Sequence, residues 1–193
     1  MRRSRAALMR AAIDVVSEQG TTAVSISDIA AAADVSRQLV YQQFCDRDTL
    51  LLDAALDLGQ RELLPALTEP LDPTGHDQAL AMARHFADHR AFYRAILSGS
   101  GGYALTRAFT DLVLPFNRDS LALVYGERLT PQAIEDLAAF LIGGATAMIV
   151  NWVVEGDDPL DSEKFTERLL RTVFLLIETM QPLPLPGDEG QDR

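Results

Sequence analysis

The sequence predicts an all-α protein with a small three-helix head at the N-terminus and a larger helical bundle behind it. Apolar residues recur at helical spacing along the whole chain, and no convincing alternation of apolar and polar residues indicates a strand. Residues 25–50 contain two short helical patterns separated by a tight turn. With 193 residues, the chain can hold one sizeable core or a head joined to a larger body.

The first predicted helix precedes this pair of short helices. Gly20 can end it, because glycine readily adopts the left-handed conformation that closes many helices. Its apolar stripe consists of Leu8, Met9, Ala12, Ile13 and Val16.

The two short helices have recognisable start and turn signals. Ser25 is placed as the N-cap of the first, and Asp28 follows three residues later, as in a capping box. Asp34 and Val35 form the turn, because aspartate tolerates a left-handed backbone. Ser36 caps the second helix.

The second short helix has one apolar side and one polar side. Val40 and Phe44, four residues apart, are expected to face inward. The opposite side carries side chains suited to base edges and phosphates, namely Arg37, Gln38, Tyr41 and Gln42. This pattern predicts a helix for sequence-specific DNA binding.

A family resemblance covers about residues 5–55, where many residues stand at fixed spacing. The positions that carry it are Gly20, Thr21, Thr22, Ser25, Asp28, Ile29, Ala30, Val35, Ser36, Val40, Tyr41, Phe44, Arg47 and Leu50. The segment resembles the DNA-binding domain of TetR-type (tetracycline-repressor-like) transcription regulators. The resemblance implies a homodimer, in most such families a repressor, that binds a palindromic double-stranded DNA operator and is released by an effector.

Roles follow for the residues expected to touch DNA. Arg37 can bond O6 and N7 of guanine together, and Gln38 or Gln42 can read adenine or a backbone oxygen. Ser25, Ser36, Tyr41 and Arg47 are expected to contact phosphates and set register. The predicted DNA-binding set is Ser25, Ser27, Ser36, Arg37, Gln38, Tyr41, Gln42, Gln43 and Arg47. As an alternative, the serines only cap their helices and Tyr41 only packs.

The net charge of −11 belongs to the body of the chain. Residues 1–50 hold six arginines and six acidic residues, whereas the remainder holds eleven basic and twenty-two acidic residues. The first four arginines precede the first acid, and this arm, Arg2–Arg10, is expected to reach the DNA backbone or an adjacent minor groove. An acidic body repels DNA except at the head. We therefore expect a protein that contacts DNA only through its head.

Several other classes are not indicated. No nucleophile–base set, metal set or cofactor loop occurs at recognisable spacing, so we predict no enzyme and no cofactor. The single cysteine, Cys45, suits a reducing cytoplasm, where we place the protein. No signal-peptide core follows the N-terminus. Glycines and polar residues interrupt the longest apolar run, Leu137–Val154, which predicts a buried helix and no membrane association.

Beyond the head, a fourth helix is expected at about 46–64, ended by Pro65, and a proline-rich loop at 65–77. Further helices are expected at about 77–90, 91–98, 104–125, 131–155 and 162–180, with a flexible glycine-rich joint at 98–102. This division predicts a DNA-binding domain at 1–48, a ligand-binding and dimerisation domain at 49–181, and a mobile tail at 182–193.

The resemblance also implies an effector cavity among the middle helices. Their aromatic, mostly uncharged residues favour an apolar or aromatic small molecule. The predicted ligand-binding residues are Phe86, His89, Tyr93, Phe109, Phe116, Met148 and Trp152. Ordinary core is the alternative for each residue. The alternative function is a DNA-binding regulator whose body binds a protein partner and encloses no ligand.

The last two predicted helices resemble those that build a four-helix dimer interface in TetR-type proteins. Small residues on helix 131–155 would let another helix approach closely. The predicted dimer residues are Phe140, Gly143, Gly144, Ala147, Asn151, Leu169 and Val173. Intrachain core is the alternative for both faces.

Two histidines four residues apart, His85 and His89, share one helix face. A metal site would need a carboxylate or a third imidazole close by, and Asp88 points elsewhere. We therefore expect a surface histidine pair and predict no metal.

Overall fold

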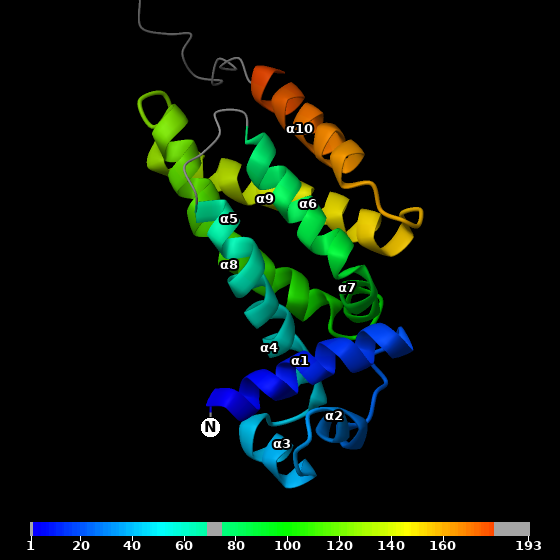
Figure 1. Ribbon diagram of the computed structural model, residues 1–193. Coiled ribbons are helices and arrows are strands. Elements are labelled where there is room, and N and C mark those ends of the chain that lie inside the picture. Colours follow the sequence, from blue (N-terminus) through cyan, green and yellow to red (C-terminus); the bar gives the residue numbers. More distant parts are fainter. Residues whose placement is uncertain (1, 69–74, 180–193) are drawn as a thin grey trace, which may run out of the picture.

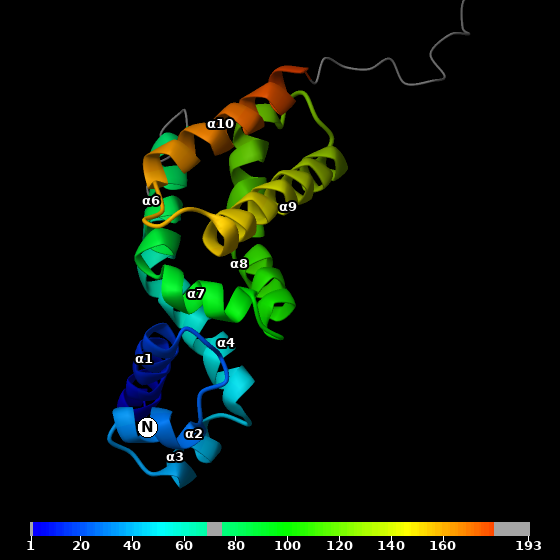
Figure 2. The ribbon, with the colours of Figure 1, turned by 90° about the vertical axis from the view of Figure 1, so that its right-hand side faces the viewer.

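The computed structural model describes residues 2–68 and 75–179, and the regular structure in these two ranges is entirely helical (Figure 1). A small head formed by the first three helices lies at one end of the molecule, and the remaining helices form the body (Figures 1 and 2). The prediction of an all-α protein with a helical head and body is confirmed. The predicted mobile tail at 182–193 lies outside the described residues, as does part of the predicted loop.

The head and its connection to the body begin with α1 (Arg2–Gln19), α2 (Ile26–Ala32), α3 (Arg37–Gln43) and α4 (Arg47–Leu58). Gly20 has a φ of 65° directly after α1, as its predicted role at the helix end requires. Asp34 has a φ of 53°, which confirms the left-handed turn between α2 and α3. α4 packs against α1 and then leads into the body.

The connecting helix does not end at Pro65. A π-helical segment, η1 (Gly59–Leu63), follows α4 directly and leads into α5 (Leu64–Thr68). The backbone N–H of Leu64 donates to the carbonyl of Gly59, five residues earlier. Pro65 follows directly after this π turn as the second residue of α5, and the helix continues to Thr68. The prediction that proline stops the helix is therefore wrong.

The body helices follow the predicted order closely. Their bounds are α6 (His76–Asp88), α7 (Arg90–Leu97), α8 (Gly102–Tyr125), α9 (Pro131–Glu155) and α10 (Ser162–Thr179). α8 packs along α9, α10 packs along α6, and α7 also contacts α1 of the head. The head therefore meets the body both through α4 and through α7.

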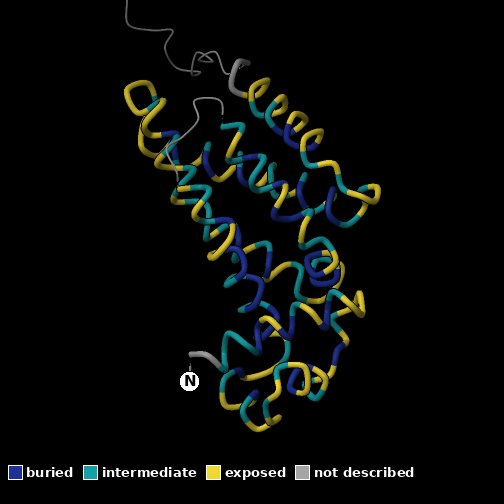
Figure 3. Tube along the Cα trace, in the orientation of Figure 1, coloured by how far each residue is buried: buried dark blue, intermediate teal, exposed yellow. Residues whose placement is uncertain are grey.

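One apolar core runs from the head into the body, as the buried segments in Figure 3 show. Leu50 and Ala54 of α4 are completely buried. At the end of α4, a Cβ on Gly59 would lie 2.9 Å from Cζ of Phe109 on α8. The connecting helix thus lies in close contact with the body. Because the packing is close, a displacement of α8 would also displace α4.

α9 is more exposed than predicted. Its apolar window has a mean hydropathy of 2.0, yet only 22% of that window is buried. By length and composition alone this helix could cross a membrane, a test that core helices of soluble proteins also pass. The expectation of a buried helix is wrong, because only a small part of this window is buried. Phe140 on this helix is 65% exposed. A large exposed apolar helix face is typical of a surface that meets another molecule.

Candidate nucleic-acid interface

Local hydrogen bonds set the start of both short helices in the head. The Oγ of Ser25 accepts from the backbone N–H of Asp28 at 3.1 Å, and the Oγ of Ser36 accepts from that of Leu39 at 3.3 Å. Both predicted N-caps are confirmed. Because these caps and the turn at Asp34 define where α3 begins, they also define which residues of α3 face outward.

α3 has the two sides that the sequence predicted. Val40 and Phe44 are 1% and 3% exposed and face the head core. The exposed residues are Arg37, Gln38, Tyr41 and Gln42. In both ribbon views α3 lies at the end of the molecule opposite α10, so body helices do not cover it (Figures 1 and 2). A short helix that presents an arginine, glutamines and a tyrosine in this way can enter a DNA groove.

Arg5 holds the C-terminal end of α3 in place. Its guanidinium donates to the carbonyl of Gln43 at 2.9 Å and to Oδ2 of Asp53 at 2.5 Å, and it lies 4.3 Å from the centre of the Phe44 ring. α1, α3 and α4 are thereby joined by one side chain. Residues Arg2–Arg10 are part of α1, and their contact with the DNA backbone or an adjacent minor groove stays a prediction.

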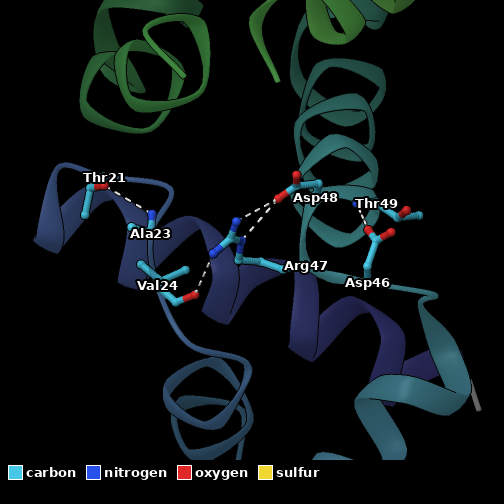
Figure 4. Close-up of polar contacts among 7 residues, drawn as sticks. All are labelled: Thr21, Ala23, Val24, Asp46, Arg47, Asp48 and Thr49. Atoms are coloured by element: carbon cyan, nitrogen blue, oxygen red, sulfur yellow. Dashed lines mark hydrogen bonds and ion pairs between the residues drawn. The ribbon is translucent and has the colours of Figure 1, made fainter. Parts of the chain in front are cut away.

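Arg47 makes its contacts within the head (Figure 4). Its Nε and Nη2 each donate to Oδ1 of Asp48 at 3.1 Å, and its Nη1 donates to the carbonyl of Val24 at 3.5 Å. The side chain is still 37% exposed. Arg47 therefore bridges the start of α4 and the segment before α2, and a phosphate would compete with these partners.

The segments on either side of α2 and α3 are also held by short-range bonds (Figure 4). Oδ1 of Asp46 accepts from the backbone N–H of Thr49 at 2.7 Å and caps α4. That hydrogen bond lowers the pKa of the Asp46 carboxyl. Before α2, Oγ1 of Thr21 accepts from the N–H of Ala23 at 3.1 Å. These bonds stabilise the loops around the two short helices.

The remaining predicted DNA-binding residues lie in the head and differ in exposure. Ser25 is exposed and Ser27 is half-buried at the start of α2. Gln43 is half-buried at the end of α3, where its carbonyl accepts from Arg5. Their contact with DNA stays a prediction.

The predicted ligand-binding residues do not gather around one cavity. An apolar cavity of about 60 Å³ lies among η1, α6, α7, α8 and α9. Of the seven residues, only Phe86 and Phe109 line it. Trp152 instead stacks on Phe165, with ring centroids 4.2 Å apart, and faces an open cleft of about 470 Å³ between the end of α9 and α10. Phe116 and Met148 are half-buried.

The histidine pair is not a surface pair. The side chain of His85 is 4% exposed, and its Nε2 lies 2.8 Å from the hydroxyl of the fully buried Tyr93. His89 is partly exposed, and its Nε2 lies 2.7 Å from Oε2 of Glu62. The sequence expectation is wrong for His85 because α7 and η1 cover it, and sequence spacing could not show that packing.

The predicted dimer residues divide between surface and core. The exposed ones all lie on α9 and are Phe140, Gly143, Gly144, Ala147 and Asn151. Leu169 is 5% exposed and belongs to the intrachain core, whereas Val173 is half-buried. The last turns of α10 expose a further apolar group, Phe174, Leu175 and Leu176.

A helix-turn-helix head with an exposed recognition helix, joined to an all-helical body, defines a DNA-binding transcription regulator. Comparison with known families supports this class over most of the chain. Residues 8–54 match the family model described as bacterial regulatory proteins, tetR family, and residues 74–174 match the transcriptional regulator C-terminal region. The chain belongs to the TetR family of bacterial regulatory proteins.

Solved structures have the same fold. A TetR-family transcriptional regulator from Streptomyces coelicolor is 22% identical with a TM-score of 0.68, over 92% of this chain and 82% of that chain. The TetR-family repressor FadR from Thermus thermophilus, in complex with lauroyl-CoA, is 20% identical with a TM-score of 0.63, over 96% and 100%. The multidrug binding protein EbrR, complexed with imidazole, is 23% identical with a TM-score of 0.57, over 86% and 93%. No curated protein matches the chain.

Proposed function

We propose that this protein is a cytoplasmic, homodimeric repressor that binds a palindromic operator and leaves it when a small apolar or aromatic effector binds. The observation that carries the proposal is the exposed polar side of α3, held by a capped and tightly packed head. Residues 1–48 then form the DNA-binding domain, and residues 49–181 provide ligand binding and dimerisation.

In this proposal α3 lies in the major groove. Arg37 bonds the O6 and N7 of a guanine, and Gln38 or Gln42 reads an adenine or a backbone oxygen. Phosphate contacts come from the serines near the helix starts, from Tyr41 and Gln43, and from Arg47 after it exchanges Asp48 for a phosphate. The acidic body keeps other surfaces away from the DNA.

Dimerisation would use the exposed face of α9. A palindrome requires two heads related by a two-fold axis, and the same patch on both protomers must then be self-complementary. A Cβ on Gly143 or Gly144 would meet nothing within 4 Å in the protomer, so these glycines border open space. A partner helix can approach such small residues closely, and the exposed Phe140 supplies apolar area beside them.

Arg37→Ala should cost about 1–3 kcal/mol of operator binding and relax the preference at one base pair, because a bidentate base contact is lost. Arg47→Ala should weaken binding to all sequences alike, because it removes a phosphate contact. An operator is first selected from random DNA with the wild-type protein. Affinities of both variants for that operator, its single-base variants and random DNA are then measured at one salt concentration. Equal losses on operator and random DNA for both variants would contradict these roles.

The effector would enter the cavity of about 60 Å³. Its lining includes Leu63 of η1, at the end of the connecting helix, together with Phe86 and Phe109. Drug-sized ligands need roughly 300–1,000 Å³, so binding would have to open the body and displace η1 and α4. That displacement would change the separation of the two heads, provided that the ligand prefers the state whose spacing misfits the operator.

The small volume of the cavity favours a second candidate, a regulator whose body binds a protein partner. A binding experiment with dodecanoate distinguishes the effector proposal from the protein-partner proposal. Dodecanoate is chosen because its chain matches the acyl group bound by FadR. Under the effector proposal it binds, releases operator DNA, and loses at least ~10-fold affinity in Thr106→Met, since the longer side chain fills the cavity. Calorimetry and DNA-binding anisotropy measure both effects. Dodecanoate binding that Thr106→Met leaves unchanged would rule out this cavity as its site.

A further inference from the structure

Three side chains that could bind a metal meet where the connecting helix contacts the body. Glu62 comes from η1, His85 from α6 and His89 from the junction of α6 and α7. Oε2 of Glu62 lies 3.6 Å from Nδ1 of His85 and 2.7 Å from Nε2 of His89. One potential ligand atom from each residue lies within 4.8 Å of the other two. A metal site at His85 and His89 needs a nearby carboxylate, and Glu62 supplies it although residue spacing along the chain did not indicate it.

The buried nitrogen of His85 is a second, independent observation. Its Nδ1 is buried and has no hydrogen-bond partner among the described residues. Its Nε2 lies 2.8 Å from the hydroxyl of Tyr93. When Nε2–H donates to that hydroxyl, Nδ1 directs an unshared lone pair toward the Glu62 carboxylate. In that tautomer, a divalent cation between the lone pair and the carboxylate would satisfy both groups.

The surroundings of His85 resemble those of a metal-bound histidine. Metal-bound histidines commonly donate their second ring N–H to a fixed partner, which here is the Tyr93 hydroxyl. The side chains of Glu62 and His89 are 42% and 26% exposed, so an ion and a water ligand can reach the site from solvent.

We propose that Glu62, His85 and His89 bind a divalent transition-metal ion, with Zn²⁺ as the best match. Two imidazoles and one carboxylate suit Zn²⁺ or its neighbours, whereas Mg²⁺ and Ca²⁺ prefer oxygen ligands throughout. Tetrahedral Zn²⁺ with bonds of ~2.0–2.2 Å needs ligand atoms about 3.3–3.5 Å apart. The present distances require only side-chain adjustment, in which the ion replaces the contact between His89 and Glu62.

The site would join two parts of the molecule. Glu62 belongs to η1, which continues α4 from the head, and His85 belongs to α6 of the body. A bound ion therefore clamps the connecting helix to the body. If the protein binds DNA as proposed above, this clamp selects one separation of the two heads and changes operator affinity.

The test uses the full-length, tag-free chain after removal of metals, with Co²⁺ and Zn²⁺ as probes. Co²⁺ should bind once per chain with the visible absorption of a tetrahedral site, and Zn²⁺ should displace it. Glu62→Gln and His89→Gln should each weaken Zn²⁺ binding by at least ~10-fold, measured against a chromophoric chelator. Tyr93→Phe should weaken it by about 10- to 100-fold, because it removes the partner that orients His85.

His76→Gln is the matched control, since it removes the remaining histidine of the chain without touching the cluster. It should leave the Zn²⁺ affinity unchanged, and circular dichroism should show each variant folded. Absence of a tetrahedral Co²⁺ spectrum, or equal Zn²⁺ affinity in wild type, Glu62→Gln and His89→Gln, would overturn the proposal. These readouts need no DNA, so failure of the metal site and failure of the proposed DNA-binding function are distinguishable.

Discussion

Gly144→Arg should yield a folded monomer that has lost tight operator binding. The protomer tolerates the change, because a Cβ at this position meets nothing within 4 Å and the residue is exposed on α9. Arginine also favours the helix more than glycine does, by up to about 1 kcal/mol. In a dimer built on this face, the new side chain holds the partner helix away and buries an unpaired charge, which costs several kcal/mol.

The loss of DNA affinity should exceed the loss from any single base contact. Two linked heads bind two half-sites with an avidity of roughly 10²–10⁴ over one head, and a monomer keeps only one. Sedimentation equilibrium measures the oligomeric state, and fluorescence anisotropy with the selected operator measures affinity.

Ala91→Arg is the matched control for this variant. Ala91 is exposed on α7, away from the proposed dimer face, and receives the same side chain. It should remain dimeric and bind the operator normally. A dimeric Gly144→Arg protein would remove this face of α9 from the interface, whereas monomeric wild-type protein would refute the homodimer itself.

Phe44→Ala should lower the free energy of unfolding by about 3–5 kcal/mol and abolish DNA binding. The Phe44 ring is 3% exposed at the end of α3 and carries the Arg5 guanidinium 4.3 Å above its centre. Its removal leaves a cavity in a head built from short helices, which have little stability of their own. Urea denaturation gives the free energy, and hydrogen exchange should show the lost protection concentrated in α1–α4.

Tyr41→Ala is the comparison variant, because it removes an aromatic side chain from the exposed side of the same helix. Tyr41 is 55% exposed, so its removal should change the free energy of unfolding by no more than about 0.5 kcal/mol while weakening DNA binding. If both variants lost the same stability, the inward and outward sides assigned to α3 would be wrong.

The sequence alone determined the head almost completely. Ser36 caps α3, Asp34 adopts the left-handed turn, and Val40 and Phe44 face inward, each as predicted. These features depend on interactions within four or five residues along the chain, so the local order of residues contains the necessary information. The helix order of the body was predictable for the same reason.

The tertiary structure decided which faces of those helices are covered. Leu169 lies in the intrachain core because neighbouring helices cover it. α9 has an exposed apolar face because no helix of the described residues covers that side. The π turn carried the connecting helix past Pro65. It also carries Glu62, which lies 2.7 Å from His89 although 27 residues separate them in the chain. Such proximity depends on how helices pack, and residue spacing along one helix contains no information about it.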